Sequence, residues 1–108
     1  MRATGRNFFS HVVRDAGFKE RVLKSFNAQP FMHTLGASIT HIAAGEVDIS
    51  VQANPALYQQ NGYYHAGVTT SIADSAAGYA AFTLFEEGSD VLTTELKMNL
   101  INPAQGDT

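Results

Sequence analysis

The residue that most needs a chemical explanation is Asp74, an acid within a long segment that otherwise holds almost no charge. Residues 66–85 (AGVTTSIADSAAGYAAFTLF) are mostly Ala, Gly, Ser and Thr, and we predict that they form one helix. A lone carboxylate on such a helix either faces solvent or lines a cleft, where desolvation would suit it to act as a general base. Its neighbours three and four positions away on the helix are all small: Thr70, Ser71, Ala77 and Gly78.

A second candidate group lies at the start of the same predicted helix, where His65 is followed by Ala66 and Gly67. The first backbone N–H groups of a helix have no partner within the helix and lie at the positive end of its dipole. They are therefore suited to hold an oxygen that gains negative charge, as an oxyanion hole does. The alternative is that His65 only caps the loop that enters the helix.

The rest of the sequence offers little familiar catalytic machinery. The chain has no Cys, so disulfides, thiolate metal sites and a nucleophilic thiol are ruled out. It also lacks a phosphate-binding glycine loop and a Gly-x-Ser-x-Gly nucleophile motif. His33 and His41 are eight residues apart across a predicted strand, too far for joint metal binding at about 3.3 Å per residue. We therefore expect neither a metal nor a cofactor.

The elements that position these groups follow from the spacing of apolar residues, and the first is a helical arm over residues 1–28. Thr4 and Asp15 are plausible helix caps. From Phe18 an apolar residue recurs at every fourth position up to Phe26, which lays one apolar stripe along a helix of about three turns.

After Pro30 the apolar period changes from helical to alternating, which predicts an antiparallel sheet. Two strands at about residues 35–40 and 46–53 are joined by a turn at residues 44–45, and a third strand is expected at about residues 91–101. The small residues of the long helix allow other backbone to approach closely, as expected for a helix wrapped by a curved sheet. The fold class is therefore α+β.

Composition limits the domain count and the partners. With 108 residues the chain has room for a single domain, residues 1–108. Only 16% of the residues are charged, against roughly 25% in an average protein, so we expect part of the surface to be shared with another subunit. A net charge of -3 gives no basic field for nucleic acid. No apolar run reaches the roughly 18 residues of a membrane span, and the start lacks a signal segment, so we expect a cytoplasmic protein.

The run at residues 64–68 (YHAGV), with residues 74–81 (DSAAGYAA) beginning nine residues after the His, resembles the hotdog-fold acyl-CoA thioesterases of the phenylacetate-degradation (PaaI-like) group. Members of that group typically show His-Gly-Gly, then an Asp nine residues after the His, then an alanine-rich helix. Residues 92–97 (LTTELK) and 102–104 (NPA) also look like that family's strand and turn after the helix. The resemblance covers about residues 30–107.

The resemblance implies a hotdog core over residues 30–108, in which an antiparallel sheet wraps a long central helix. It also implies an acyl-CoA thioesterase, which hydrolyses a thioester to a carboxylic acid and free CoA. Asp74 occupies the place of the family's catalytic carboxylate, acting as general base on water or as nucleophile. After His65, Ala66 falls where a backbone N–H donates to the thioester carbonyl, and Gly67 keeps the second glycine of the motif.

Further positions follow from the same resemblance. Thr93 falls where a Ser or Thr hydroxyl helps to hold the attacking water. Gln59 lies six residues before His65, where relatives often carry an Asn that orients substrate or water, and Asn61 is a possible substitute. The side chains that could line a pocket for an aromatic or an aliphatic acyl group are Tyr58, Tyr63, Tyr64 and Phe31.

The distance between two residues of this motif predicts that the active protein contains more than one copy of the chain. Ala66 and Asp74 are eight residues apart, which is about 12 Å along a helix axis. A reacting carbonyl must lie within about 3 Å of its donor and near the base or its water, so one carbonyl cannot contact both groups of one helix. We therefore expect antiparallel helices of two copies to share each site, in a homodimer or in a homotetramer built as a dimer of dimers.

Two interpretations from other classes remain open. One is a non-catalytic acyl-CoA or small-ligand binding protein on the same fold, which would bind tightly without releasing thiol. The other is a hotdog hydratase or dehydratase, which would act on an enoyl-CoA. Hotdog domains of this group usually continue for several more strands, so we expect either that the C-terminal strands are missing from this chain or that a partner chain completes the sheet.

Overall fold

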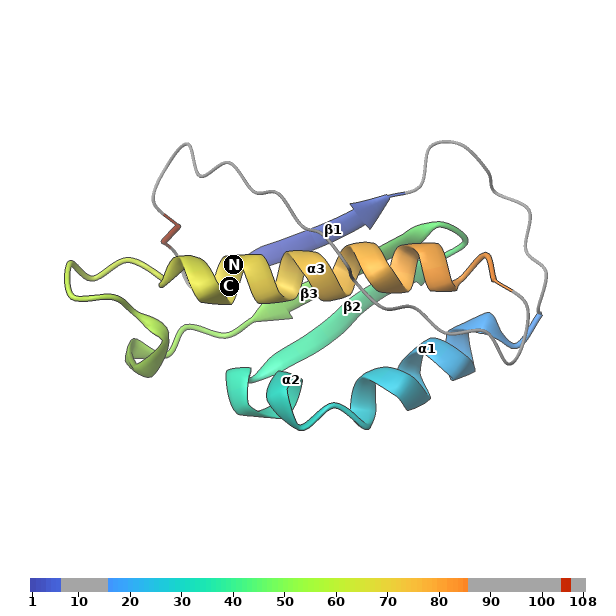
Figure 1. Ribbon diagram of the computed structural model, residues 1–108, viewed down its shortest axis with the longest axis horizontal. Helices are drawn as coiled ribbons and strands as arrows, with labels where there is room; N and C mark the ends of the chain where they lie inside the picture. Colours follow the sequence, from blue (N-terminus) through green and yellow to red (C-terminus); the bar gives the residue numbers. More distant parts are fainter. Residues whose placement is uncertain (7–15, 86–103, 106–108) are drawn as a thin grey trace.

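The computed structural model describes residues 1–6, 16–85 and 104–105 (Figure 1). Its longest element, α3, lies along a three-stranded sheet, and two shorter helices lie to one side of it. The sheet order is β1-β3-β2, and both strand pairs are antiparallel. In chain order the elements are β1 (Arg2–Arg6), α1 (Phe18–Asn27), α2 (Pro30–Leu35), β2 (Ala37–Ala43), β3 (Glu46–Val51), a 3-10 turn (Pro55–Leu57) and α3 (Ala66–Phe82).

The β2–β3 hairpin confirms the turn predicted at Ala44 and Gly45. Gly45 has a φ of 72°, a left-handed conformation that glycine adopts without steric cost. β3 is the central strand of the described sheet, and its inward residues Val47, Ile49 and Val51 are fully buried. The alternation that predicted this strand therefore also identified the side chains that form the core.

Close packing of α3 on the sheet depends on small residues, as the sequence predicted. The buried side of α3 includes Val68, Ile72 and Ala76. At Gly5 in β1, an added Cβ would lie 2.2 Å from the carbonyl oxygen of Ala76, so only glycine fits at this crossing. The predicted α+β hotdog arrangement, a long helix lying on an antiparallel sheet, is therefore confirmed.

The helical arm predicted over residues 1–28 is only partly correct. The α1 helix (Phe18–Asn27) confirms the apolar stripe, but residues 2–6 form the strand β1 instead of a helix. Thr4 is consequently a strand residue and not a helix cap. The strand signal was weak because its inward residues, Ala3 and Gly5, are small and barely apolar. Residues 7–15 of the predicted arm, with the predicted cap Asp15, lie outside the described residues.

A short helix, α2, ends at Leu35, where the sequence predicted the start of a strand. α1 ends at Asn27, and Pro30 begins α2, because the fixed φ of proline suits the first position of a helix. Gly36 ends α2 with a left-handed φ of 67°, so β2 begins at Ala37 and not at Leu35. The strand expected at residues 91–101 lies outside the described residues.

Side-chain contacts hold α3 against α1 and against Gln29, which follows α1. The Tyr79 hydroxyl lies 3.0 Å from the Ser25 hydroxyl and accepts a hydrogen bond of 2.6 Å from Gln29 Nε2. The Arg21 guanidinium lies 4.4 Å from the centre of the Phe82 ring, a cation–π contact. Within the described residues, none of the helices is both long enough and apolar enough to cross a membrane.

Candidate functional site

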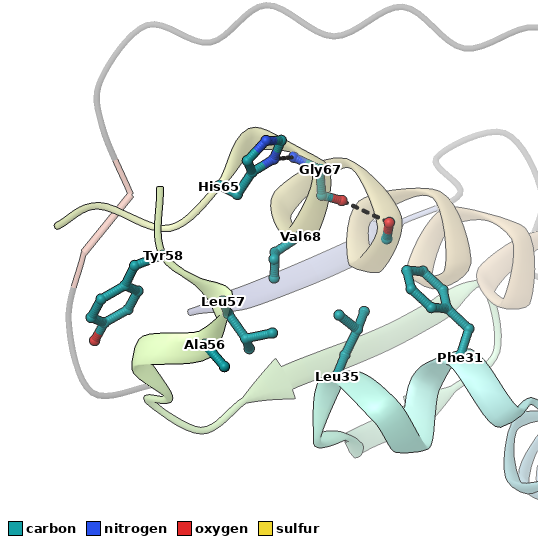
Figure 2. A pocket seen from close by; sticks show the side chains of 9 residues that line it. Phe31, Leu35, Ala56, Leu57, Tyr58, His65, Gly67 and Val68 are labelled. Atoms are coloured by element: carbon teal, nitrogen blue, oxygen red, sulfur yellow. Dashed lines mark hydrogen bonds between the residues drawn. The ribbon is translucent and has the colours of Figure 1, made fainter. Parts of the chain in front are cut away.

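The N-terminus of α3 is held by its own capping residue. His65 is the N-cap, and its Nδ1 accepts a hydrogen bond of 2.8 Å from the Gly67 N–H, drawn as a dashed line in Figure 2. Because Nδ1 accepts, a neutral ring must carry its proton on Nε2. The His65 backbone N–H donates to the Leu57 carbonyl oxygen at 2.9 Å, which ties the 3-10 turn to the start of α3. His65 therefore caps the helix, the alternative that the sequence left open.

This cap leaves Ala66 as the first donor of the helix that is open to a ligand. The Gly67 N–H is already used by His65. Ala66 is exposed, and among the residues that the structure describes none accepts a hydrogen bond from its N–H. The helix dipole makes this position electrostatically positive. The Ala66 N–H is therefore suited to bind a carbonyl oxygen that gains negative charge.

A cavity of about 300 Å³ opens beside this end of α3. It lies between α2, the 3-10 turn and the first turns of α3, and Figure 2 shows side chains from all three elements converging on it. The two residues that flank Ala66 are both in its wall, so the Ala66 N–H lies next to the cavity. The described residues lining it are Phe31, Leu35, Ala56, Leu57, Tyr58, His65, Gly67, Val68 and Ser71.

Two side-chain polar atoms in the cavity wall are engaged within the protein. The Ser71 hydroxyl donates to the Gly67 carbonyl oxygen at 2.6 Å, and His65 Nδ1 is occupied as described above. Sequence reasoning named Phe31 and Tyr58 as pocket candidates but missed Ser71. The signal that could have found it is its spacing: Ser71 is four residues after Gly67, so both lie on the same side of the helix.

Asp74 lies further along the same side of α3. It is seven residues after Gly67, so it is rotated by only about 20° but displaced by about 10 Å along the axis. Its side chain is half-buried, and it is not part of the cavity wall. Within one copy, the structure therefore separates the predicted base from the predicted carbonyl donor, as the helix geometry required.

The three predicted substrate-binding residues lie in and after the loop that precedes α3. The Gln59 side-chain oxygen accepts a hydrogen bond from the Asn61 backbone N–H, so it shapes its own loop. Asn61 is exposed, and Tyr64 is buried with its ring edge-to-face against Tyr58, 5.0 Å between centroids. None of these three residues is among the described residues that line the cavity, whereas their neighbour Tyr58 is. Thr93 lies outside the described residues.

No metal site is formed by the histidines that the structure places. His33 Nε2 lies 2.8 Å from the Asn27 carbonyl oxygen, and His41 Nε2 lies 3.3 Å from a Glu46 carboxylate oxygen across the hairpin. In the described ranges, no three His, Asp or Glu side chains are close enough to hold a metal ion together. These histidines therefore have local structural contacts.

The model of the family described as "Domain of unknown function (DUF4442)" matches residues 19–108. The chain is similar to the crystal structure of a thioesterase family protein from Silicibacter pomeroyi, with 47% sequence identity and a TM-score of 0.82. The similarity covers 84% of this chain and 67% of that chain. No curated protein matches significantly.

Proposed function

Since the chain belongs to the DUF4442 family and to the thioesterase family, we propose that it is an acyl-CoA thioesterase of the PaaI-like group. It hydrolyses an acyl-CoA to a carboxylic acid and free CoA, in the reducing cytoplasm that its lack of Cys fits. The observation that carries the proposal is the open Ala66 N–H at the start of α3, beside an apolar cavity.

The first role belongs to the α3 N-terminus. The thioester carbonyl oxygen accepts a hydrogen bond from the Ala66 N–H and is further stabilised by the helix dipole as it becomes negative. His65 and Gly67 position this donor, because their mutual hydrogen bond fixes the first turn of the helix. Removal of one such donor typically costs about 10²–10³ in rate.

The second role belongs to Asp74 of a neighbouring copy. As a general base it takes a proton from water while the water oxygen bonds to the carbonyl carbon; as a nucleophile its own oxygen forms that bond, and water then releases the acid. The carbon–sulfur bond breaks in either case. The thiolate that leaves comes from a thiol with a pKa of about 8.5 on the cysteine scale, so a strong general acid is unnecessary.

Two copies of α3, antiparallel across a two-fold axis, bring these groups together. The side of α3 away from the sheet carries small residues, with Gly67 and Ala77 exposed, so another backbone can approach it closely. A homodimer, or a tetramer built as a dimer of dimers, follows from this arrangement. In it, Thr93 helps to hold the attacking water, while Gln59, Asn61 and Tyr64 orient the CoA thioester.

Free-thiol release from a panel of acyl-CoAs tests the proposal. We expect Asp74→Asn to lower turnover by at least about 10²-fold while the native mass of the oligomer stays unchanged. Ser75→Ala, one position along the same helix, is the matched control and should retain turnover. Undiminished turnover in Asp74→Asn would refute the assignment of the base. Tight acyl-CoA binding without thiol release would instead indicate a binding protein, and hydration of an enoyl-CoA would indicate a hydratase.

A further inference from the structure

We infer that the acyl group of the thioester occupies the cavity beside the α3 N-terminus, and that Phe31 and Ala56 set the size of the acyl group that the enzyme accepts. The inference rests on the proposed function and names its substrate class: acyl groups that are compact, apolar and uncharged. The position of the cavity supports this inference, because His65 and Gly67, which flank the carbonyl donor Ala66, are both in the cavity wall. A carbonyl held at Ala66 therefore has its acyl chain at the mouth of this cavity.

The chemistry of the wall favours an uncharged acyl group. Figure 2 shows Val68 directed from α3 toward Leu57 and Leu35, so these aliphatic side chains meet across the space. The His65 Nδ1 and the Ser71 hydroxyl described above already bond within the helix. Among the described lining residues none is Asp, Glu, Lys or Arg, so a second carboxylate on the acyl group would enter the cavity without a charged partner.

The volume of the cavity matches an acyl group of modest length. Its 300 Å³ lies at the lower end of ligand pockets. At about 30 Å³ for each water-sized group, it holds roughly ten non-hydrogen atoms. Acyl groups of about six to eight carbons, straight or aromatic, fill that space, and further carbons of a longer chain extend beyond its described walls.

Two residues on different walls can change this volume without disturbing the core. Phe31 on α2 is 52% exposed, and in Figure 2 its ring reaches from α2 toward α3. Ala56 is exposed in the 3-10 turn, whose geometry depends on its backbone N–H bonded to Asn54 and not on its methyl group. Neither belongs to the buried core, so substitutions at these positions alter the cavity while the fold is retained.

Equilibrium binding of S-alkyl-CoA thioethers of increasing chain length tests the assignment without requiring catalysis. In the wild-type protein we expect affinity to rise by up to about fourfold for each added methylene until about eight carbons, and to stop rising beyond that. Affinity that is independent of chain length, or that continues to rise to sixteen carbons, would overturn the inference.

Substitutions in the wall should move this limit in opposite directions. Ala56→Phe should shift the preferred chain length down by about two carbons or more, and Phe31→Ala should shift it up, because a phenyl ring added to the wall takes up cavity volume and a ring removed from it frees volume. The matched controls are Ala53→Phe and Leu23→Ala, which make the same kinds of change at exposed positions outside the cavity wall and should leave the preference unchanged.

The two readouts separate the inference from the proposed function. Chain-length-dependent binding that shifts in Ala56→Phe, without thiol release from any acyl-CoA, would support the acyl cavity and refute the hydrolase. Thiol release whose chain-length profile is identical in Ala56→Phe and the wild type would overturn the cavity assignment while leaving the hydrolase in place.

Discussion

At the scale of single residues, His65 shows how a side chain can matter to a site without touching the reacting atoms. Its Nδ1 accepts the Gly67 N–H at 2.8 Å and so removes the second donor of the helix from the ligand. Ala66, one residue earlier, is left as the donor next to the cavity. His65 and Gly67 of the motif therefore form the cap of the helix, and Ala66 carries the N–H that is proposed to polarise the thioester carbonyl.

Replacing His65 tests this division. His65→Ala removes the acceptor at the N-cap, and we expect it to destabilise the protein by about 1 kcal/mol, a fall in Tm of about 4–8 °C for a domain of this size. His65→Asn restores an N-cap acceptor and should recover most of that loss and most of the turnover. Thermal unfolding and thiol release of the two variants make the comparison. A His65→Ala variant that melts at the wild-type temperature would mean that the cap contributes nothing.

At the scale of elements, the sequence predicted α1, the β2–β3 hairpin and α3 because each has a strong apolar period or a distinct turn. The two misjudged segments lacked such a signal. β1 turns only Ala3 and Gly5 inward, and α2 is six residues long, too short to show a helical period. The motif placed Asp74 and Ala66 on one helix, but the cavity depends on α2 and the 3-10 turn, which local spacing does not bring to α3.

Gly5 gives the sharpest test of the packing between elements. Gly5→Ala places a Cβ 2.2 Å from the Ala76 carbonyl oxygen, so β1 or α3 must move. We expect a loss of about 1–3 kcal/mol, the usual cost of overpacking. Thr4→Ala, at an exposed position of the same strand, is the control and should unfold close to the wild type in chemical denaturation. An unchanged midpoint for Gly5→Ala would contradict the close approach of β1 to α3.

At the scale of the whole molecule, the geometry of one helix sets the need for a partner. Asp74 lies about 12 Å along the axis from Ala66, and the cavity lies at the Ala66 end. A single copy therefore presents a donor and an acyl cavity at one end of α3, with its carboxylate two turns away. In the proposed assembly, two copies supply each other's missing group, so every site contains Asp74 of one copy and Ala66 of the other.

Ala66→Pro provides a selective way to remove the donor. Proline lacks the N–H and is favoured at the first position of a helix, so the helix should persist. The preceding residue, His65, already has φ -61° and ψ 139°, the conformation that a following proline requires. Like Asp74→Asn, this variant alone should lose at least about 10²-fold in turnover.

The most direct test of the shared site is to combine these two inactive variants in one dimer. Copies carrying Asp74→Asn and Ala66→Pro, each with a different affinity tag, are mixed, exchanged and purified as the heterodimer, and thiol release is measured. One of its two sites then contains both native groups, so the account predicts about half of the wild-type specific activity. A purified heterodimer as inactive as its two parents would contradict it.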